Sequence, residues 1–411
     1  MSDTLKPENA EQLLQAVQWA VAEKQPLEVL AGGSKRAYGR PMQTAATLDL
    51  SALYGIKIYE PAELYMTALA GTPMSDIDAA LAEAGQQLSF EPPDLGPLLG
   101  GAANAGTIGG VVACNLAGPR RIKEGAARDH VLGFHAVSGR GETFKSGGTV
   151  VKNVSGFDLS KLLAGSLGTL AVMSEVTLKV LPAPEKIRTL LICWRTDGVY
   201  DHGAMTAMSR ALGSPHDVSG AAHLPAAVAA RSSVDYVSNS GGGVTALRVE
   251  GPAPSVEHRA KALTETLKEF GQIEELHTSN SKTFWQEIRD VSAFVGRDDL
   301  PIVWHLSVPP ASGAKVALSL LEELRGEVIY DWGGGSIWLA LAGGDAHADE
   351  VRAAVAKTGG HATLIRAPVD VRAETPVFQP RLGPESDVTK NIKIGFDPDG
   401  ILNPGRMYQG V

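Results

Sequence analysis

The sequence Gly106-Thr-Ile-Gly-Gly-Val-Val-Ala-Cys-Asn-Leu-Ala-Gly118 opens the stretch that decides the fold, which runs on to Pro182. Two more glycine-containing runs follow within it, Val151-Lys-Asn-Val-Ser-Gly-Phe-Asp-Leu159 and Gly165-Ser-Leu-Gly-Thr-Leu-Ala-Val-Met-Ser-Glu-Val-Thr-Leu178. Glycine lets a backbone approach a ligand closely, because it has no side chain to hold the ligand away. The stretch is therefore typical of a protein whose backbone packs against a large, flat, phosphate-bearing cofactor.

An earlier glycine turn, Gly32 to Pro41, follows a predicted strand over 27–31. Successive backbone N–H groups in such a turn can bind an anion, and Lys35 and Arg36 add positive charge, so a diphosphate would suit it. The turn lacks the Gly-x-Gly-x-x-Gly of a Rossmann crossover and the Gly-Lys-Ser/Thr of a P-loop, so neither fold is indicated. If this turn is considered without the other motifs, an ordinary surface turn is the alternative interpretation.

Several motifs, in this order, resemble those of the FAD-binding domain in the vanillyl-alcohol oxidase and p-cresol methylhydroxylase (PCMH) family. They lie at 31–41, 90–94, 106–110, 114–120, 128–133, 152–159, 165–170 and 396–406. The run Asp331-Trp-Gly-Gly334 and the modest length point further, to the FAD-binding E subunits of bacterial glycolate oxidases. The resemblance implies an α+β fold: a PCMH-type FAD-binding domain of two α+β subdomains, plus an α+β cap domain with an antiparallel sheet.

Pro182 and Pro184 interrupt the chain and suggest the main domain boundary. We expect an FAD-binding domain over 1–184, a cap domain for substrate or subunit contacts over 185–380, and a C-terminal segment, 381–411, that by resemblance returns to the FAD-binding domain. Periodicity predicts helices over 8–24, 76–84, 159–164, 256–270, 314–324 and 348–357. It predicts strands near 27–31, 48–50, 56–59, 64–70, 131–137, 142–145, 170–181, 190–194, 245–250, 302–308 and 336–341.

Composition limits the function classes. A net charge of −9 argues against a nucleic-acid partner, which would require a basic face. Cys114 and Cys193 are the two cysteines and neither lies in a Cys-x-x-Cys, so the chain is not expected to bind an iron–sulfur cluster by itself. The sequence has no signal-peptide pattern and no apolar run of bilayer length. We expect a cytoplasmic protein without a membrane span, with peripheral contact at the inner membrane only through partners.

The resemblance assigns FAD contacts to the glycine-rich motifs. Backbone groups of two segments would hold the diphosphate. The first segment is the turn, with Gly32, Gly33, Ser34, Lys35 and Arg36, and the second is the run at 106–110, with Thr107, Gly109 and Gly110. The remaining predicted contacts are Asn115 near the ring system, Asp158, Gly168 and Thr169 on the far side, Val172 at the ring edge, and Asn403 in the Asn-Pro-Gly motif. For each glycine, a plain turn is the alternative.

The turn from Gly32 to Pro41 is called the phosphate turn. Some relatives in the family attach flavin covalently through a His in this turn. Here the turn offers Ser34-Lys-Arg36 and contains neither His nor Cys, so we expect non-covalent FAD. With a 2-hydroxy acid such as glycolate, hydride would leave Cα for the flavin, a base would take the hydroxyl proton and cations would hold the carboxylate. Arg366, Arg36 and Arg120 are candidate carboxylate clamps, and a solvated or salt-bridged arginine is the alternative for each. The base is not identified.

Two further features carry competing interpretations. His216 and His223 have the separation of a metal-binding pair found in related 2-hydroxy-acid dehydrogenases, with Glu257-His258 following. The surrounding residues differ from that pattern, so we predict no metal. Trp332, Gly333, Gly334 and Trp338 lie on a predicted strand. The two tryptophans would shield the flavin, form a subunit interface or simply fill the core.

The resemblance favours an FAD-binding subunit of a glycolate oxidase complex that includes a sister flavoprotein and an iron–sulfur subunit. Two alternatives stay open. The chain would be an electron-relay or assembly subunit without its own substrate site, or a self-sufficient flavin oxidase acting on another alcohol.

Overall fold

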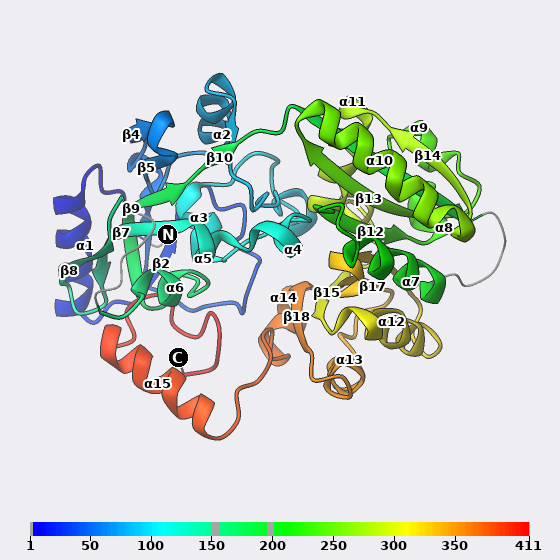
Figure 1. Cartoon of the computed structure of the whole chain (residues 1–411). Coiled ribbons are helices and arrows are strands. Elements are labelled where there is room, and N and C mark those ends of the chain that lie inside the picture. Colours follow the sequence, from blue (N-terminus) through cyan, green and yellow to red (C-terminus); the bar gives the residue numbers. More distant parts are fainter. Residues whose placement is uncertain (1–2, 150–155, 195–200, 411) are drawn as a thin grey trace. The chain divides into compact units, whose positions relative to one another are not determined.

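The computed structural model describes residues 3–149, 156–194 and 201–410 (Figure 1). The chain divides into two compact units. Unit 1 consists of Met1–Ala117, Gly125–Pro182 and Pro376–Val411, and unit 2 of Gly118–Glu124 and Ala183–Thr375. The chain crosses between the units after Pro182 and after Thr375. Residues 118–124, in contrast, belong to unit 2 although they lie within the predicted FAD-binding range.

The first layer of unit 1 is a small parallel sheet covered by a helix. Its strand order is β1 (Asp3–Leu5), β3 (Ala46–Asp49), β2 (Leu27–Leu30). Helix α1 (Ala10–Ala22) begins where Asn9 accepts a hydrogen bond from the Gln12 backbone. The fully buried residues of α1 recur at helical spacing: Leu13, Val17 and Ala20. They pack in one core with Leu27 of β2 and Leu48 of β3.

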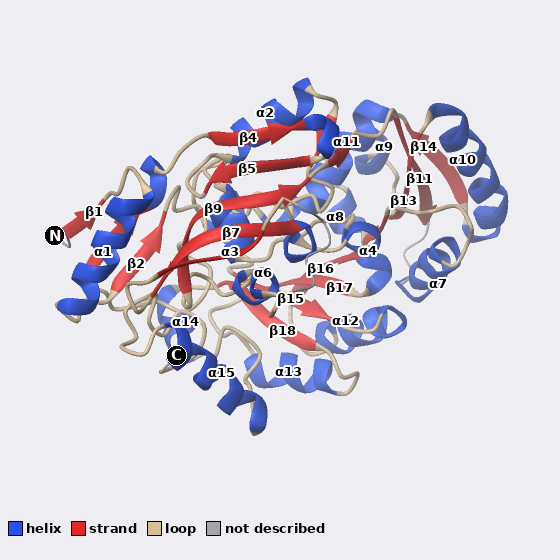
Figure 2. Cartoon of the chain, turned by 60° about the vertical axis from the view of Figure 1, so that its left-hand side comes forward, coloured by secondary structure: helices blue, strands red, loops and turns tan. Residues whose placement is uncertain are grey.

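The second layer of unit 1 is a five-stranded antiparallel sheet. Figure 2 shows β4, β5, β9 and β7 side by side. The full order is β4 (Ile56–Glu60), β5 (Tyr65–Leu69), β9 (Ala171–Lys179), β7 (Val131–Ser138), β8 (Thr143–Gly147). Its helices are α2 (Met74–Glu83), α3 (Ile108–Ala113), α5 (Ala127–His130) and α6 (Leu159–Leu163), and α15 (Pro384–Phe396) comes from the C-terminal segment. A short pair, β6 (Gln86–Gln87) and β10 (Leu181–Pro182), completes the strands described in unit 1. The two layers confirm the α+β class.

Unit 2 is built on one eight-stranded sheet in which every neighbouring pair is antiparallel. The order is β14 (Gln272–Leu276), β11 (Lys186–Trp194), β13 (Gly243–Gly251), β12 (Gly220–Leu224), β16 (Gly326–Asp331), β17 (Ser336–Leu341), β15 (Ile302–Ser307), β18 (His361–Arg366). The antiparallel cap sheet was predicted from the resemblance.

This sheet contains two successive βαββαβ repeats of the ferredoxin-like kind. The first is β11, α7 (Asp201–Leu212), β12, β13, α10 (Ala253–Leu267), β14, and the second is β15, α12 (Gly313–Leu321), β16, β17, α13 (Ala348–Ala356), β18. In each repeat the spatial order is fourth, first, third, second strand. The repeats join at their second strands, where His223 pairs with Tyr330. Helices α8 (Ala226–Ala229), α9 (Asp235–Ser238), α11 (Thr278–Arg289) and α14 (Val369–Glu374) are additions.

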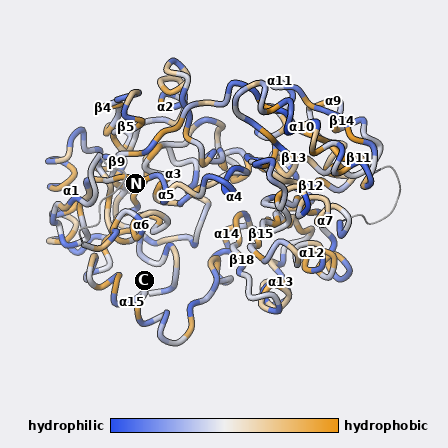
Figure 3. Tube along the Cα trace, viewed as in Figure 1, coloured by the Kyte–Doolittle hydropathy of each residue, from blue (hydrophilic) through white to orange (hydrophobic). Residues whose placement is uncertain are grey.

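Charged contacts hold residues 118–124 within unit 2. The segment includes α4 (Arg121–Glu124), which is hydrophilic (Figure 3). Arg120 makes two hydrogen bonds to the Glu250 carboxylate of β13, at 2.7 and 2.8 Å, and both side chains are buried. Trp332 Nε1 donates to the Gly118 carbonyl at 3.1 Å, and the Arg121 guanidinium lies 4.9 Å from the centre of the same indole ring. The segment is thus an integral part of unit 2.

The Arg120–Glu250 pair predicts a pH dependence of stability. Burial alone would raise the pKa of Glu250, but the charge of Arg248 and the hydrogen bonds from Arg120 outweigh it and lower the pKa from 4.5 to about 2. A lowered carboxyl pKa stabilises the fold above pH 4.5, and this contribution, roughly 3 kcal/mol, is lost as pH falls toward 2. We therefore expect Glu250→Gln to be less stable than wild type at pH 7, with the difference shrinking below pH 4.5.

Urea unfolding at a series of pH values checks this expectation. Tryptophan fluorescence suits the measurement, because five of the six tryptophans belong to unit 2. Glu265→Gln removes an exposed glutamate of α10 and is the control. A difference between wild type and Glu250→Gln that stays constant from pH 7 to 2.5 would contradict the assignment.

Within the described ranges, no helix has the length and apolar character that a bilayer span requires.

Candidate functional site

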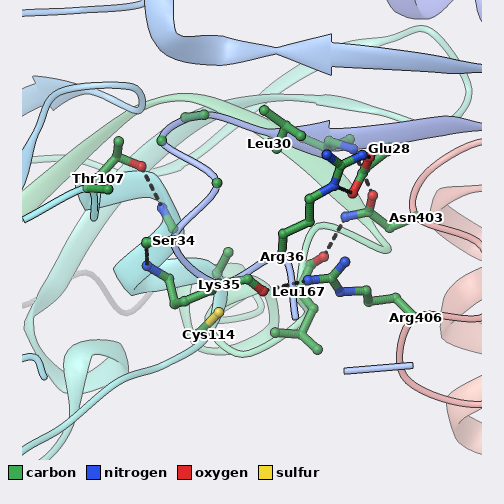
Figure 4. Close-up of a pocket in the computed structure, with 17 residues that line it drawn as sticks. Glu28, Leu30, Ser34, Lys35, Arg36, Thr107, Cys114, Leu167, Asn403 and Arg406 are labelled. Atoms are coloured by element: carbon green, nitrogen blue, oxygen red, sulfur yellow. Dashed lines mark hydrogen bonds and ion pairs between the residues drawn. The ribbon is translucent and has the colours of Figure 1, made fainter. Parts of the chain in front are cut away.

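Two adjoining cavities in unit 1 bring together the glycine-rich motifs. The first is drawn in Figure 4, and the second shares eight lining residues with it. Most of their wall residues come from four parts of the sequence, 28–36, 105–114, 167–173 and 403–406, and Leu50 and Ala70 complete the second cavity. The shared residues are Val29, Leu30, Ala31, Thr107, Gly110, Ala113, Leu167 and Asn403.

The first cavity has a cationic wall. Lys35, Arg36 and Arg406 line it together with Ser34, Thr107 and Glu28, whose carboxylate pairs with Arg36. Lys35 Nζ donates to Ser34 Oγ at 3.1 Å, and Arg406 Nη2 donates to the Lys35 carbonyl at 2.8 Å (Figure 4). Two backbone hydrogen bonds fold the turn itself, from Arg36 N to Gly33 O and from Tyr38 N to Lys35 O, both 3.0 Å. Positive groups and open backbone at one turn suit a diphosphate.

The second cavity is largely apolar. Its own wall residues include Leu50, Val172 and Met173. Gly109 and Gly168 also lie on this wall. An apolar space beside a cationic turn matches a ligand that has both a planar ring and a phosphate chain.

The glycines of the motifs serve two distinct purposes. A Cβ on Gly32 would lie 1.9 Å from the Ala105 carbonyl oxygen, and one on Gly109 would lie 2.7 Å from that of Ala70, so both are required by backbone packing. Gly33 differs, because its φ is +69° and a Cβ there would meet no protein atom within 4 Å. This glycine keeps space in front of the cationic turn open, and the residues present fit an FAD diphosphate.

Asn403 joins three walls of the cavities. Its side chain is buried, its Oδ1 accepts a hydrogen bond from the Val29 backbone at 2.8 Å, and its Nδ2 donates to the Leu167 carbonyl at 2.7 Å. Its backbone N–H donates to the Leu27 carbonyl at 3.0 Å. Both ends of the amide are therefore used to hold β2 and the 165–169 turn together.

The structure places the predicted cofactor contacts in two groups. Eleven of them line one or both cavities: Gly32, Gly33, Ser34, Lys35, Arg36, Thr107, Gly109, Gly110, Gly168, Val172 and Asn403. Asn115, Asp158 and Thr169 line neither. Asn115 Oδ1 accepts a hydrogen bond from the Arg128 backbone at 2.9 Å, and Asp158 caps α6. Residues 152–155 of the 152–159 motif lie outside the described residues.

Several lining residues were not predicted as cofactor contacts, and Arg406 and Cys114 are two of them. Arg406 follows the Asn-Pro-Gly motif, and its proximity to that motif was the available signal. Cys114 follows α3 and is partly exposed as a residue. Desolvation of its thiol raises the thiol pKa, and the positive charges of Lys35 and Arg406 oppose this rise. The position of Cys114 within the glycine-rich run at 106–118 was the sequence signal that could have identified it.

The three candidate carboxylate clamps all have intramolecular partners. Arg36 makes hydrogen bonds of 2.8 and 2.5 Å to the Glu28 carboxylate, which raise the pKa of Arg36. Arg120 is paired with Glu250 as described. Arg366 donates to the backbone carbonyls of Phe294, Leu300 and Pro301 at 2.7, 2.6 and 3.3 Å. Arg36 belongs to unit 1 and the other two to unit 2.

The histidine pair is not assembled as a metal centre in the described part of the chain, where no group of three metal-ligating side chains is found. His223 is buried on β12, where Nδ1 lies 2.9 Å from Thr245 Oγ1 and Nε2 lies 3.8 Å from Asp201 Oδ1. Glu257 forms an ion pair with Lys186. His223 thus belongs to a buried polar network at the joint of the two repeats.

The two predicted tryptophans flank a histidine in unit 2. The ring centres of Trp338 and Trp332 lie 4.6 and 5.5 Å from that of His305. Burial lowers the pKa of His305 to about 3, so its ring is neutral, and its Nε2 lies 2.9 Å from Ser336 Oγ. These rings form one half-buried aromatic cluster.

Comparison with known proteins agrees with the geometry. Residues 3–147 match a family described as an FAD binding domain. The chain is 34% identical to glycolate oxidase subunit GlcE of Escherichia coli over 402 residues, which is 96% of each chain, and 25% identical to subunit GlcD of Bacillus subtilis over 98% of this chain and 88% of that one. Among solved structures, p-cresol methylhydroxylase with substrate bound matches with a TM-score of 0.70 at 15% identity, covering 98% of this chain and 88% of that one.

Fold, cavities and relatives define an FAD-binding oxidoreductase of the PCMH type. Within this class, the chain belongs to the family of glycolate oxidase subunit GlcE. The predicted family, fold class and cofactor are thereby confirmed.

Proposed function

We propose that this chain is the FAD-binding subunit of a glycolate (2-hydroxy acid) oxidase that supports oxidation of glycolate to glyoxylate. The observation that carries the proposal is full-length similarity to GlcE combined with a cavity whose walls are the cofactor motifs. Ser34, Lys35 and Arg406 would hold the diphosphate, and the apolar wall with Val172 would take a planar ring. When bound, FAD supplies a two-electron acceptor.

A second candidate function is an electron-relay or assembly subunit. The observation that favours it is that Arg36, Arg120 and Arg366 are all engaged by intramolecular partners. A carboxylate clamp requires guanidinium donors directed at the substrate. In this alternative, a sister flavoprotein oxidises the 2-hydroxy acid.

Anaerobic reduction separates these functions. The purified, FAD-loaded chain is mixed with glycolate without oxygen, with acetate as the control because it lacks the hydroxyl group. Loss of the yellow flavin absorbance with glycolate alone supports oxidation by this chain. Unchanged absorbance supports the relay function, and quinone reduction by the isolated chain at full rate supports a self-sufficient oxidase.

We further propose that the functional unit contains a sister flavoprotein and an iron–sulfur subunit. The support is that this chain offers only Cys114 and Cys193 as thiolates, one in each unit, which cannot supply the four ligands that a cluster commonly takes. Gentle co-purification from the native host should recover both partners together with iron. The complex is proposed to be cytoplasmic, with contact to the inner membrane only through those partners, and recovery of the lone chain at full activity would contradict it.

FAD is expected to be bound non-covalently. Among the described residues that line the two cavities there is no histidine, and Cys114 is the one cysteine. Acid precipitation of the yellow protein should therefore release all the flavin into the supernatant. Flavin in the pellet would contradict the prediction, and its loss from the pellet of Cys114→Ser would identify the attachment point.

A further inference from the structure

A buried ion pair lies in the C-terminal segment, between Lys393 on α15 and Asp397 just after it. Lys393 Nζ donates to Asp397 Oδ2 at 2.6 Å, to the Thr169 carbonyl at 2.7 Å and to the Leu402 carbonyl at 3.1 Å. An ammonium group has three N–H donors, so all of them have acceptors. The Asp397 carboxylate also accepts from the backbone N–H groups of Ile401 and Leu402, at 2.9 and 2.8 Å. Both side chains are more than nine-tenths buried.

This pair fixes the turn that leads to the cavity wall. Directly after the turn, Leu402 forms a parallel bridge with Leu27, and the Leu27 backbone donates to the Ile401 carbonyl at 2.8 Å. Asn403 then contacts Val29 and Leu167, and Arg406 contacts the phosphate turn. Through Thr169, Lys393 also holds the chain next to Gly168, which lines the apolar cavity.

Asp397 is held tightly from a third side. A Cβ on Gly139 would lie 2.3 Å from the Asp397 carboxyl carbon, so the hairpin between β7 and β8 packs directly on this residue. A buried ion pair contributes little net stability compared with an apolar pair of similar volume, because both charges lose their hydration. Its distinctive contribution here is geometric, since it fixes several backbone groups at defined positions.

We propose that Lys393 and Asp397 are positioning residues for FAD, which set cofactor affinity by holding residues 401–406 against β2 and the phosphate turn. The inference rests on the proposed FAD site and adds two residues that touch neither cavity. It assigns the last part of unit 1 a direct role in cofactor retention.

Three variants test the proposal. Lys393→Met breaks the pair and leaves Asp397 buried without its cation. Lys393→Met/Asp397→Leu removes both charges and keeps the volume apolar. Lys390→Met removes an exposed lysine of the same helix and is the matched control. For each, the FAD dissociation constant is measured by flavin fluorescence titration, and the stability of the FAD-free chain by thermal unfolding.

We expect the single and the double variant each to bind FAD about tenfold or more weakly, as loss of outer partners of a binding site commonly does. The double variant should regain thermal stability relative to Lys393→Met, because it contains no unpaired buried charge. A pair with a merely structural role would regain FAD affinity together with stability. If the wild type binds FAD and the double variant binds it with the same affinity, the positioning proposal is overturned and the proposed FAD site is not. A wild-type chain that binds no FAD overturns both the proposal and the site.

Discussion

Gly33→Val is expected to weaken FAD binding by about 100-fold or more, which corresponds to roughly 2.7 kcal/mol. The φ of Gly33 is +69°, a conformation that a β-branched residue adopts only with strain. Gly33 lines the first cavity, and no protein atom lies within 4 Å of the position that a Cβ would take, so the added isopropyl group would occupy open space at the wall proposed to bind the diphosphate. Titration of the FAD-free variant with FAD measures the effect.

Gly85→Val is the matched control for backbone strain. Gly85 has a φ of +63°, a Cβ there would also meet no protein atom within 4 Å, and it is an exposed residue after α2. We expect both variants to lose similar stability, whereas only Gly33→Val loses FAD. If Gly33→Val retains wild-type flavin content at normal stability, Gly33 is a turn residue without a ligand role.

Asn403→Ala is expected to cost about 3 kcal/mol of stability and to weaken FAD binding at least about tenfold, because two buried hydrogen bonds are lost and their backbone partners stay unsatisfied. Its φ of +41° adds strain for alanine, since asparagine tolerates this region better. Urea unfolding of the FAD-free chain and FAD titration report the two effects separately.

Asn104→Ala controls for the strain term. Asn104 is exposed and has a φ of +59°, so the variant changes the same backbone preference at the surface. Equal destabilisation of the two variants would show that the side-chain hydrogen bonds of Asn403 contribute no stability.

The sequence was sufficient to predict which motifs lie together at the cavities, because the residue patterns of these motifs are local. A cationic glycine turn at 32–36 and a glycine-rich run at 106–110 need particular residue types at particular spacings, and both line the cavities. The ends of α1 were also close to the prediction, since Asn9 is a capping residue directly before an amphipathic pattern.

The partners of charged residues could not be predicted from local pattern. Arg120 pairs with a glutamate 130 positions away, and Arg406 reaches a carbonyl 371 positions away. Both contacts depend on tertiary structure, so the sequence alone could not distinguish a carboxylate clamp from an internal ion pair. The duplicated cap repeat was also missed, because β14, β16 and β18 were not among the predicted strands. The sequence of β14, for example, is Gln-Ile-Glu-Glu-Leu, which lacks the strict alternation that identifies a half-buried strand.

The contribution of Asn403 and Arg406 to the cavity wall sets an order of events during synthesis. The ribosome makes the phosphate turn early, and at roughly 5–20 residues per second it reaches residues 403–406 only tens of seconds later. The whole of unit 2 is translated in between. A nascent chain thus carries three of the four main wall segments for most of its synthesis, and the cavity wall is complete only when the chain is nearly finished.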